Sequence, residues 1–279
     1  MEWKELEQEL INSKYHFHHT DNGVLLCGDC SEILSEIPDN TADLILTDPP
    51  YKISKEGNKI SRNFKNYVWK RQKDIGLDFG EWDRQWEDDN EYFLWVENWF
   101  KELARIAKDK TWFYIWFDKQ KIGIFDLILA PKYGLKSRTI FVWAKSNPAP
   151  SFRKVNWVSA TEFCWVGSKG DSKLKNFLYQ KEMFNYMIHP NKSSYGETDH
   201  PTEKPKAIFS KIVRVSTDEN QIVLDPFLGS GTTAVVCEKL NRRWIGIEIN
   251  PEYCEIVKKR LQQSSELHDE HFGKRRTLI

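Results

Sequence analysis

The residues Asp48, Pro49, Pro50 and Tyr51 could act together on a planar ring that carries an amino group. Asp48 offers a carboxylate, the Pro49 carbonyl offers a second hydrogen-bond acceptor, and Tyr51 offers an aromatic face. Both prolines lack an amide hydrogen and fix φ at about −65°, so the chain cannot continue there as a helix or a central strand. The apolar run 44–47 before them indicates a buried strand. We therefore predict a turn at a strand's end that presents these groups to a ligand.

The chemistry that suits this turn is the methylation of a nucleobase amino group. Such a nitrogen is a poor nucleophile because its lone pair is delocalised into the ring. Acceptors that hold its two hydrogens draw it toward tetrahedral geometry, so Asp48 and the Pro49 carbonyl could activate it while Tyr51 stacks on the base. The alternative is an Asp that caps a turn and a Tyr that packs in the core. These four residues alone leave both readings open.

A second stretch, residues 222–234, has the pattern of a cofactor-binding turn. A short apolar strand ends in an Asp, and a glycine-containing turn then leads into a helix. Glycines let the backbone approach a ligand, and the free amides at a helix N-terminus attract a carboxylate or phosphate. The candidate cofactor-binding residues here are Asp225, Pro226, Phe227, Gly229, Ser230, Gly231 and Thr232.

Two further carboxylates follow predicted strands. Glu248 lies about 20 residues after the glycine turn, a spacing typical of a carboxylate that binds ribose hydroxyls. Asp29 follows the strand 24–27, where it could bind ribose or adenine groups, or simply cap the next helix. This arrangement predicts an adenosine-bearing cofactor. The turn does not exclude NAD, but the Asp48 turn offers nothing for hydride transfer, so we favour S-adenosylmethionine.

The elements that must position these residues alternate between strand and helix. Strands are predicted near 24–27, 44–47, 111–117, 139–143, 222–225 and 243–248, and helices between them. Residues 1–20 are expected to be a short helical lead-in. The alternation predicts an α/β fold with a mostly parallel sheet and helices on both faces. In such folds binding sites form at the carboxyl ends of the strands.

Two segments are candidates for contact with DNA. Residues 52–73 mix basic and aromatic side chains without periodicity, which suits a loop that meets a phosphate backbone. Residues 151–199 are the least regular part, and we interpret them as a target-recognition insert. We therefore predict one catalytic domain, 1–279, with a DNA-contacting loop at about 52–90. The candidate DNA-binding residues are Lys55, Lys59, Arg62, Lys65, Lys70, Arg71 and Asn147.

The composition limits the remaining possibilities. The chain has 279 residues with 41 Lys+Arg and 41 Asp+Glu, so contact with nucleic acid must come from local segregation of charge. No apolar run approaches the ~20 residues that span a bilayer, and the N-terminus lacks the features of a signal peptide. We expect a cytoplasmic protein without membrane contact. Cys27 and Cys30 have C-x-x-C spacing but no second ligand pair follows, so no metal is expected.

Together these motifs resemble the permuted β group of the DNA amino-methyltransferases. The resemblance covers about 24–51, 103–150 and 200–263, and it rests on D-P-P-Y at 48–51, D-P-F-x-G-x-G-T-T at 225–233, the pair Gly28-Asp29, and H-P-T-x-K-P at 200–205. It implies a Rossmann-like S-adenosylmethionine-dependent methyltransferase fold with one reversed edge strand. Asp29 and Glu248 would then hold the adenine amino group and the ribose. His200, Thr202 and Lys204 would belong to the cofactor site, with Lys204 near the methionine carboxylate.

The resemblance also implies methyl transfer from S-adenosylmethionine to a base flipped out of duplex DNA, leaving S-adenosylhomocysteine. Asp48 in the first catalytic position, where cytosine-N4 enzymes more often have Ser, favours adenine N6. The alternatives are a cytosine-N4 enzyme, a non-catalytic DNA-binding subunit, or an enzyme that acts on RNA or protein. The sequence leaves open the recognition site, a homodimer, and a cognate restriction endonuclease in a prokaryotic cell or phage genome.

Overall fold

The computed structural model describes residues 2–52, 86, 88–148, 157–191 and 204–273, with side chains up to residue 264. The chain divides into two compact units. The larger comprises 1–49 and 97–279, and the smaller comprises 50–96. Each is described by itself below.

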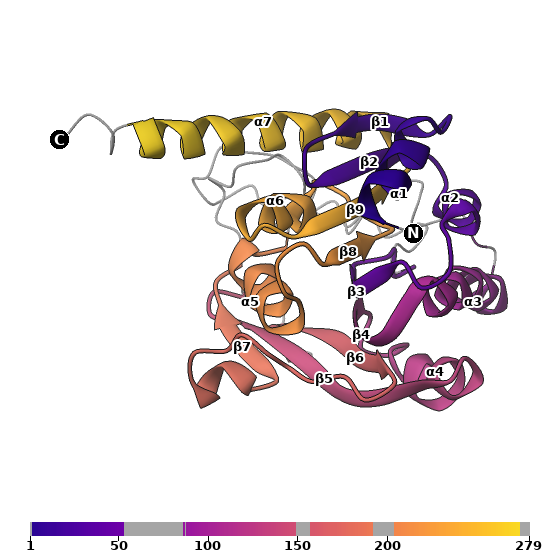
Figure 1. Cartoon of the computed structure of the whole chain (residues 1–279). Helices are drawn as coiled ribbons and strands as arrows, with labels where there is room; N and C mark the ends of the chain where they lie inside the picture. Colours follow the sequence, from indigo (N-terminus) through magenta and orange to yellow (C-terminus); the bar gives the residue numbers. More distant parts are fainter. Residues whose placement is uncertain (1, 53–85, 87, 149–156, 192–203, 274–279) are drawn as a thin grey trace, which may run out of the picture. The chain divides into compact units, whose positions relative to one another are not determined.

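The larger unit is built on a mixed sheet whose order is β1-β2-β9-β8-β3-β4-β6-β5-β7 among the described residues (Figure 1). The five neighbours from β2 to β4 run parallel. β1 is reversed at one edge, and β6 is reversed between β4 and β5. The predicted mostly parallel α/β sheet is confirmed. The strands are β1 (His16–His19), β2 (Gly23–Cys27), β3 (Ala42–Thr47), β4 (Ala107–Phe117), β5 (Leu135–Lys145), β6 (Thr161–Lys169), β7 (Tyr186–His189), β8 (Ile222–Asp225) and β9 (Arg243–Glu248).

Helices flank the sheet on both faces, as predicted (Figure 1). Figure 1 shows α2 and α4 on one side of the strands and α5 and α6 on the other. Since β2→β3 and β8→β9 cross the sheet in opposite directions, right-handed crossovers put α2 and α6 on opposite faces. The helices are α1 (Trp3–Ile11), α2 (Cys30–Glu36), α3 (Asp89–Ile106), α4 (Ala130–Lys132) after a π-helical turn (Phe125–Leu129), α5 (Lys206–Ser216), α6 (Thr232–Lys239) and α7 (Pro251–Gly273).

An aromatic cluster fills the core beside β4 and β6. The rings of Phe100, Phe125 and Trp165 lie 5.4 to 5.9 Å apart, and Trp99 and Phe113 pack against them. All five side chains are buried. Many of the chain's Trp and Phe side chains therefore pack in the core, where contacts between aromatic rings stabilise the fold.

Two expectations about local structure were wrong. His16–His19 forms β1 at the edge of the sheet and does not belong to a helical lead-in. The supposedly irregular stretch 151–199 supplies β6, which is paired on both sides, and β7. The β6 sequence has the aromatic and β-branched residues of a strand, but the Lys, Ser and Asn residues around it hid that signal.

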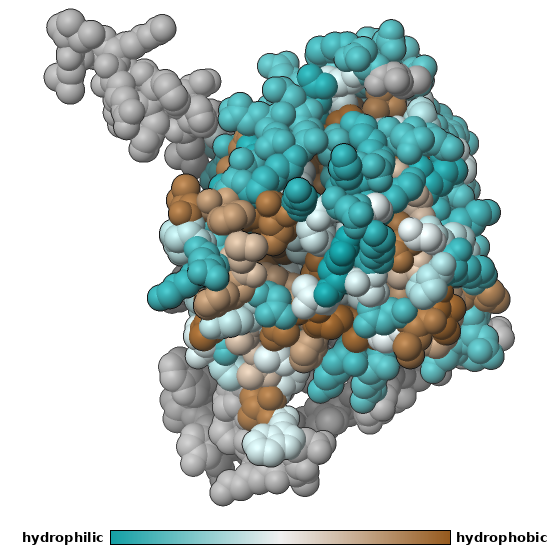
Figure 2. Space-filling model, turned by 60° about the horizontal axis from the view of Figure 1, so that its bottom comes forward, coloured by the Kyte–Doolittle hydropathy of each residue, from teal (hydrophilic) through white to brown (hydrophobic). Residues whose placement is uncertain are grey.

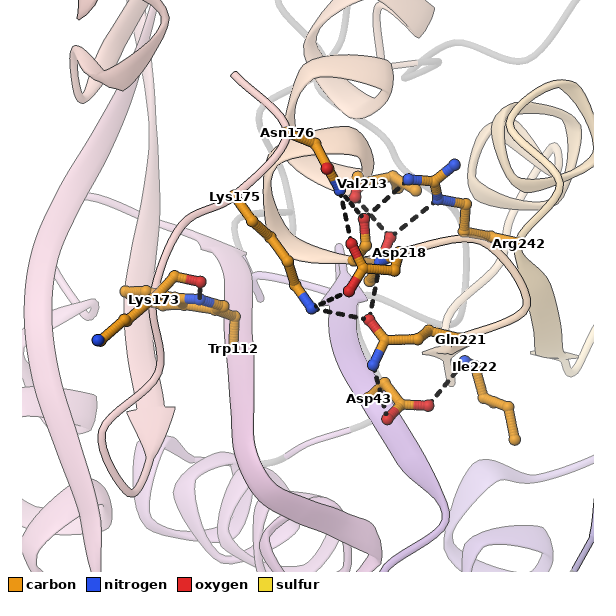
Figure 3. Close-up of polar contacts among 11 residues, drawn as sticks. Asp43, Trp112, Lys173, Lys175, Asn176, Val213, Asp218, Gln221, Ile222 and Arg242 are labelled. Atoms are coloured by element: carbon orange, nitrogen blue, oxygen red, sulfur yellow. Dashed lines mark hydrogen bonds and ion pairs between the residues drawn. The ribbon is translucent and has the colours of Figure 1, made fainter.

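The amino ends of β3 and β8 are tied together by a polar network, and the chain that links β6 to β7 is bound to it (Figure 3). Asp43 accepts the Ile222 amide at 2.9 Å, and Lys175 binds Asp218 at 2.5 Å. Asn176 donates to the Thr217 carbonyl at 2.9 Å. This network fixes the edge of the sheet opposite to the one where Asp48 lies.

The β7 end of the sheet carries exposed apolar side chains. Figure 2 brings the lower side of Figure 1 forward and shows apolar side chains among polar ones. Leu178 and Ile188, on the approach to β7 and on β7 itself, are 81% and 66% exposed. The buried core therefore lies toward the middle strands. Within the described parts of the chain, no helix is long and apolar enough to cross a membrane.

Candidate active site

The two motifs meet at one edge of the sheet, as the sequence predicts. β3 runs parallel to β8, and β8 runs parallel to β9, so their carboxyl ends share an edge. Asp48 directly follows β3, Asp225 ends β8, and Glu248 ends β9. The predicted catalytic turn and the glycine turn thus follow neighbouring strands, the usual place for ligands in an open α/β sheet.

Asp48 is held by a buried lysine. The Lys204 Nζ lies 2.5 Å from Asp48 Oδ2 and 3.1 Å from Glu162 Oε2. Lys145 in turn pairs with Glu162 Oε1 at 2.7 Å. Burial would lower the pKa of Lys204, but the charges of Asp48 and Glu162 outweigh burial and raise it above its usual value. Lys204, expected near the methionine carboxylate, thus binds the carboxylate of the predicted catalytic Asp.

The other half of the D-P-P-Y motif belongs to the 50–96 unit. The Pro50 carbonyl accepts a hydrogen bond from the Tyr92 hydroxyl at 2.7 Å. Tyr92 is buried, and Trp86 packs edge-on against its ring at 4.8 Å. Tyr51 is half-buried. Asp88 caps α3 by accepting the Glu91 amide at 2.8 Å.

Asp225 holds the start of the glycine turn from inside the protein. Its carboxylate accepts the hydroxyls of Thr47 at 2.7 Å and Thr233 at 2.5 Å, and the Phe227 amide at 3.1 Å. Burial raises the pKa of Asp225 to about 7. These contacts join β3, β8 and α6, so Asp225 fixes the geometry of the turn.

The glycine turn needs a residue without a side chain at 231. Gly231 has φ +84°, a conformation that other residues rarely adopt. A Cβ there would lie 2.9 Å from both Cγ atoms of Val257. Ser230, next to it, is buried, and both its carbonyl and its hydroxyl accept from Arg260 Nη1, at 2.5 and 3.1 Å. Arg260 comes from α7 and belongs to no motif, so sequence reasoning missed it.

Asp29 and Glu248 lie at the ends of adjacent parallel strands. Cys27 is opposite Glu248 in the β2–β9 register, and the Gly28 amide donates to the Glu248 carbonyl at 3.0 Å. The Glu248 carboxylate accepts the Gly229 amide at 2.8 Å, and burial raises its pKa. Asp29 is exposed and caps α2 through the Ser31 amide at 2.7 Å. Capping leaves the Asp29 carboxylate open to solvent at the site's edge.

The Thr232 hydroxyl is the feature that fits a bound cofactor best. Its oxygen is buried and finds no hydrogen-bond partner within the described chain. Thr232 is the first residue of α6, where free backbone amides attract an anionic group. A buried hydroxyl without a partner is costly unless a ligand completes it. The residues present therefore fit S-adenosylmethionine. Its carboxylate could accept hydrogen bonds from the Thr232 hydroxyl and the amides at the start of α6, and its ribose hydroxyls could donate to the carboxylates of Asp29 and Glu248.

The remaining predicted site residues fall in three groups. Pro226 is buried in the turn, and the Phe227 ring packs edge-on against Trp99 at 5.5 Å. The Asn147 side chain makes two hydrogen bonds with the Asn191 backbone. Its oxygen accepts from the Asn191 amide at 2.5 Å, and its nitrogen donates to the Asn191 carbonyl at 3.3 Å. Outside the described residues lie His200, Thr202, Lys55, Lys59, Arg62, Lys65, Lys70 and Arg71.

Cys27 and Cys30 are free thiols, and Cys30 is buried at the start of α2. Over the described ranges, no group of three or more His, Cys, Asp or Glu residues is arranged as metal ligands.

Comparison with known proteins gives a consistent picture. The sequence matches a family of DNA methylases over residues 42–259. The type II methyltransferase M2.LlaDCHI of Lactococcus lactis subsp. cremoris is 31% identical over 263 residues, covering 89% of this chain and 93% of that protein. The type II methyltransferase M.HinfI of Haemophilus influenzae is 33% identical over 267 residues, covering 86% of this chain and 68% of that protein.

Solved structures are similar over most of the chain. The crystal structure of the M1.HpyAVI-SAM complex has 26% identity and a TM-score of 0.62, and the match covers 85% of this chain and 98% of that one. The PvuII DNA methyltransferase, named as cytosine-N4-specific, has 20% identity and a TM-score of 0.66, with 92% and 95% covered. The second likeness bears on the fold alone.

Proposed function

This chain belongs to the DNA methylase family, and we propose that it methylates the N6 amino group of adenine at a specific site in DNA. It is a DNA methyltransferase that uses S-adenosylmethionine. The choice of adenine N6 is supported by one observation above the others. A carboxylate, that of Asp48, stands at the catalytic strand end beside the cofactor turn.

The protein's part in this reaction is to hold and activate the acceptor nitrogen. In our proposal the Asp48 carboxylate and the Pro49 carbonyl each accept a hydrogen bond from the amino group of a flipped-out adenine, and Tyr51 stacks on its ring. Pro50 keeps the turn rigid, since its φ is fixed. When bound, S-adenosylmethionine supplies the methyl group as an electrophile on a positive sulfur.

The cofactor would be held at both ends by groups on three strand ends. Thr232 and the amides of the Phe227–Thr232 turn suit the methionine part, and Glu248 and Asp29 suit the ribose and adenine. Asp225 and Pro226 shape the turn. His200 and Thr202 complete the assignment.

Recognition of DNA is assigned to two segments of the single catalytic domain. The loop at about 52–90 would contact the backbone through its basic side chains, and the segment at about 151–199 would read the target sequence. Asn147, at the end of β5, would contribute from the neighbouring strand. The names of the relatives support a type II methyltransferase. Our proposal places it in the bacterial cytoplasm, with a cognate restriction endonuclease and a second copy of the chain as further partners.

The test is to identify the modified nucleoside. The protein is incubated with labelled S-adenosylmethionine and DNA of mixed sequence, the DNA is digested, and the labelled nucleosides are separated. We expect N6-methyladenine. Label in N4-methylcytosine would contradict the proposal in favour of the rival acceptor, and an absence of label would favour a DNA-binding subunit without activity.

A further inference from the structure

Four charged side chains alternate in sign beside the proposed catalytic carboxylate. Asp48 follows β3, Lys204 precedes α5, Glu162 lies at the start of β6, and Lys145 ends β5. The links are 2.5 Å from Asp48 to Lys204, 3.1 Å from Lys204 to Glu162, and 2.7 Å from Glu162 to Lys145. Two cations and two anions make the cluster neutral.

This cluster costs stability unless every charge in it is compensated. The Lys204 side chain is only 8% exposed, and those of Lys145 and Glu162 are 16% and 26% exposed. Moving such charges out of water carries a large penalty for each ion, about as large as the attraction that the ion pairs return. A hydrophobic set of side chains would stabilise these strand ends at least as well. The arrangement therefore suits a role at the site better than a role in stability.

The cluster restrains a side chain that is otherwise flexible. Lysine carries its charge on a long stem with many rotamers, so one ion pair would fix its position poorly. Here the Lys204 Nζ has two anions, and it also lies 5.6 Å from the centre of the Trp116 ring. Lys145 has a similar second contact, 5.1 Å from the Trp143 ring. Both lysines are thus held on two sides.

We propose that Glu162, anchored by Lys145, is a positioning residue for methyl transfer. It fixes the Lys204 ammonium group, which in turn holds Asp48 Oδ2 and so sets the plane of the carboxylate that receives the substrate amino group. The inference rests on the proposed function, since it concerns the same site. Hydrogen-bond acceptors for a reacting nitrogen must be placed within a fraction of an ångström, so loss of this support slows the reaction without removing a reacting group.

The charge of Glu162 also affects the pH range in which Lys204 stays protonated. Among the described residues, the charged and titratable groups that face Lys204 include Asp48, Glu162 with Lys145 behind it, and the buried Cys164. Glu162 is one of the two anions that raise the Lys204 pKa against the effect of burial. Without its charge the ammonium group loses its proton at lower pH.

The experiment compares Glu162→Gln with Glu97→Gln. Glu97 is a matched control because it pairs with Lys132 elsewhere, and its side chain is 24% exposed. We expect Glu162→Gln to lower kcat about 10- to 100-fold, with the Kd of S-adenosylmethionine and the KM of DNA within about twofold. Glu162→Asp, which keeps the charge, should recover most of kcat, and Glu97→Gln should match wild type.

Each result decides a different point. If wild type methylates no adenine, the proposed function fails. If wild type is active and folded Glu162→Gln keeps the wild-type kcat, this inference fails. It also fails if Glu162→Asp is as slow as Glu162→Gln. Should Glu162→Gln lose its cooperative unfolding transition, Lys145→Gln takes its place, with kcat expected to fall several-fold and an unchanged kcat overturning the inference.

Discussion

At the scale of single residues, the site contains buried polar groups, some of which have a hydrogen-bond partner in the described chain while one has none. Thr233 and Asp225 are buried and bonded to each other, whereas the Thr232 hydroxyl is buried without a partner within the described chain. Burial makes each of these groups sensitive to change, because an unmade hydrogen bond in the interior costs about 1–3 kcal/mol. The pairing of a satisfied and an unsatisfied threonine in one helical turn allows a direct test.

Thr232→Val should have opposite effects on stability and binding. Without cofactor it should raise the free energy of unfolding by about 1 kcal/mol, because it removes a buried hydroxyl that lacks a partner. It should also weaken S-adenosylmethionine binding about tenfold. Denaturant unfolding and calorimetric titration measure the two effects.

Thr233→Val is the matched control. Its hydroxyl donates to Asp225 at 2.5 Å, so the same substitution should lower the free energy of unfolding. If both variants lost stability equally, the Thr232 hydroxyl would have to be satisfied in the free protein, contrary to our account.

Asp225 should make stability depend on pH. Its pKa is raised by burial from 3.8 to about 7, so the folded protein binds this proton more tightly than the unfolded chain. Its contribution is fully present below about pH 4 and is lost as pH rises through about 7. The free energy of unfolding should therefore fall over this range by an amount on the order of 4 kcal/mol. Urea unfolding from pH 4 to pH 7 should show a flatter profile for Asp225→Asn, and an unchanged slope would contradict this assignment.

At the scale of elements, strand ends and one helix start position the chemistry. Two side chains hold the β8–α6 turn. Asp225, at the end of β8, accepts a hydrogen bond from Thr233, and Arg260 of α7 donates to the Ser230 carbonyl. The sequence predicted the turn itself, because glycine and a strand-to-helix change leave a local signal. It could not predict Arg260, which is 30 residues away in the chain and follows no local pattern.

Gly231→Ala should distort this turn. The φ of +84° disfavours any side chain, and the added Cβ would meet Val257 at 2.9 Å. We expect a loss of stability of about 1–3 kcal/mol together with weaker S-adenosylmethionine binding. Gly123→Ala is the control, since a Cβ there has no atom within 4 Å. Equal melting temperatures for the two variants would show that the turn tolerates a side chain.

At the scale of the whole molecule, the sheet order brings distant motifs to one edge. Asp48 and Asp225 are far apart in sequence, but β3 and β8 are parallel neighbours. Alternation of strand and helix was enough to predict this, because parallel strands end at the same edge. The Lys204 contact with Asp48 spans 156 residues and needed the structure.

Strand β6 and the Glu162–Lys145 ion pair were not predicted from the sequence, because both depend on tertiary contacts. β6 was missed because the Lys, Ser and Asn residues around it hide its aromatic and β-branched residues, and its pairing with β4 and β5 is a tertiary contact that no local pattern shows. No local sequence pattern marks Glu162 or Lys145. Only the packing of β5 beside β6 shows that they form part of one cluster.

The most direct test of the central claim is methyl transfer by Asp48→Ala with cofactor binding measured on the same sample. The claim is that Asp48 acts on the acceptor base at a site whose cofactor part is built by other residues. Single-turnover methylation of DNA and the Kd of S-adenosylmethionine are measured for wild type, Asp48→Ala and the surface control Asp39→Ala, which loses an exposed ion pair with Arg105 outside both proposed DNA-recognition segments. We predict that Asp48→Ala loses transfer by at least about 1,000-fold and keeps its Kd within about threefold, while Asp39→Ala matches wild type. Transfer at the wild-type rate by Asp48→Ala would contradict the account.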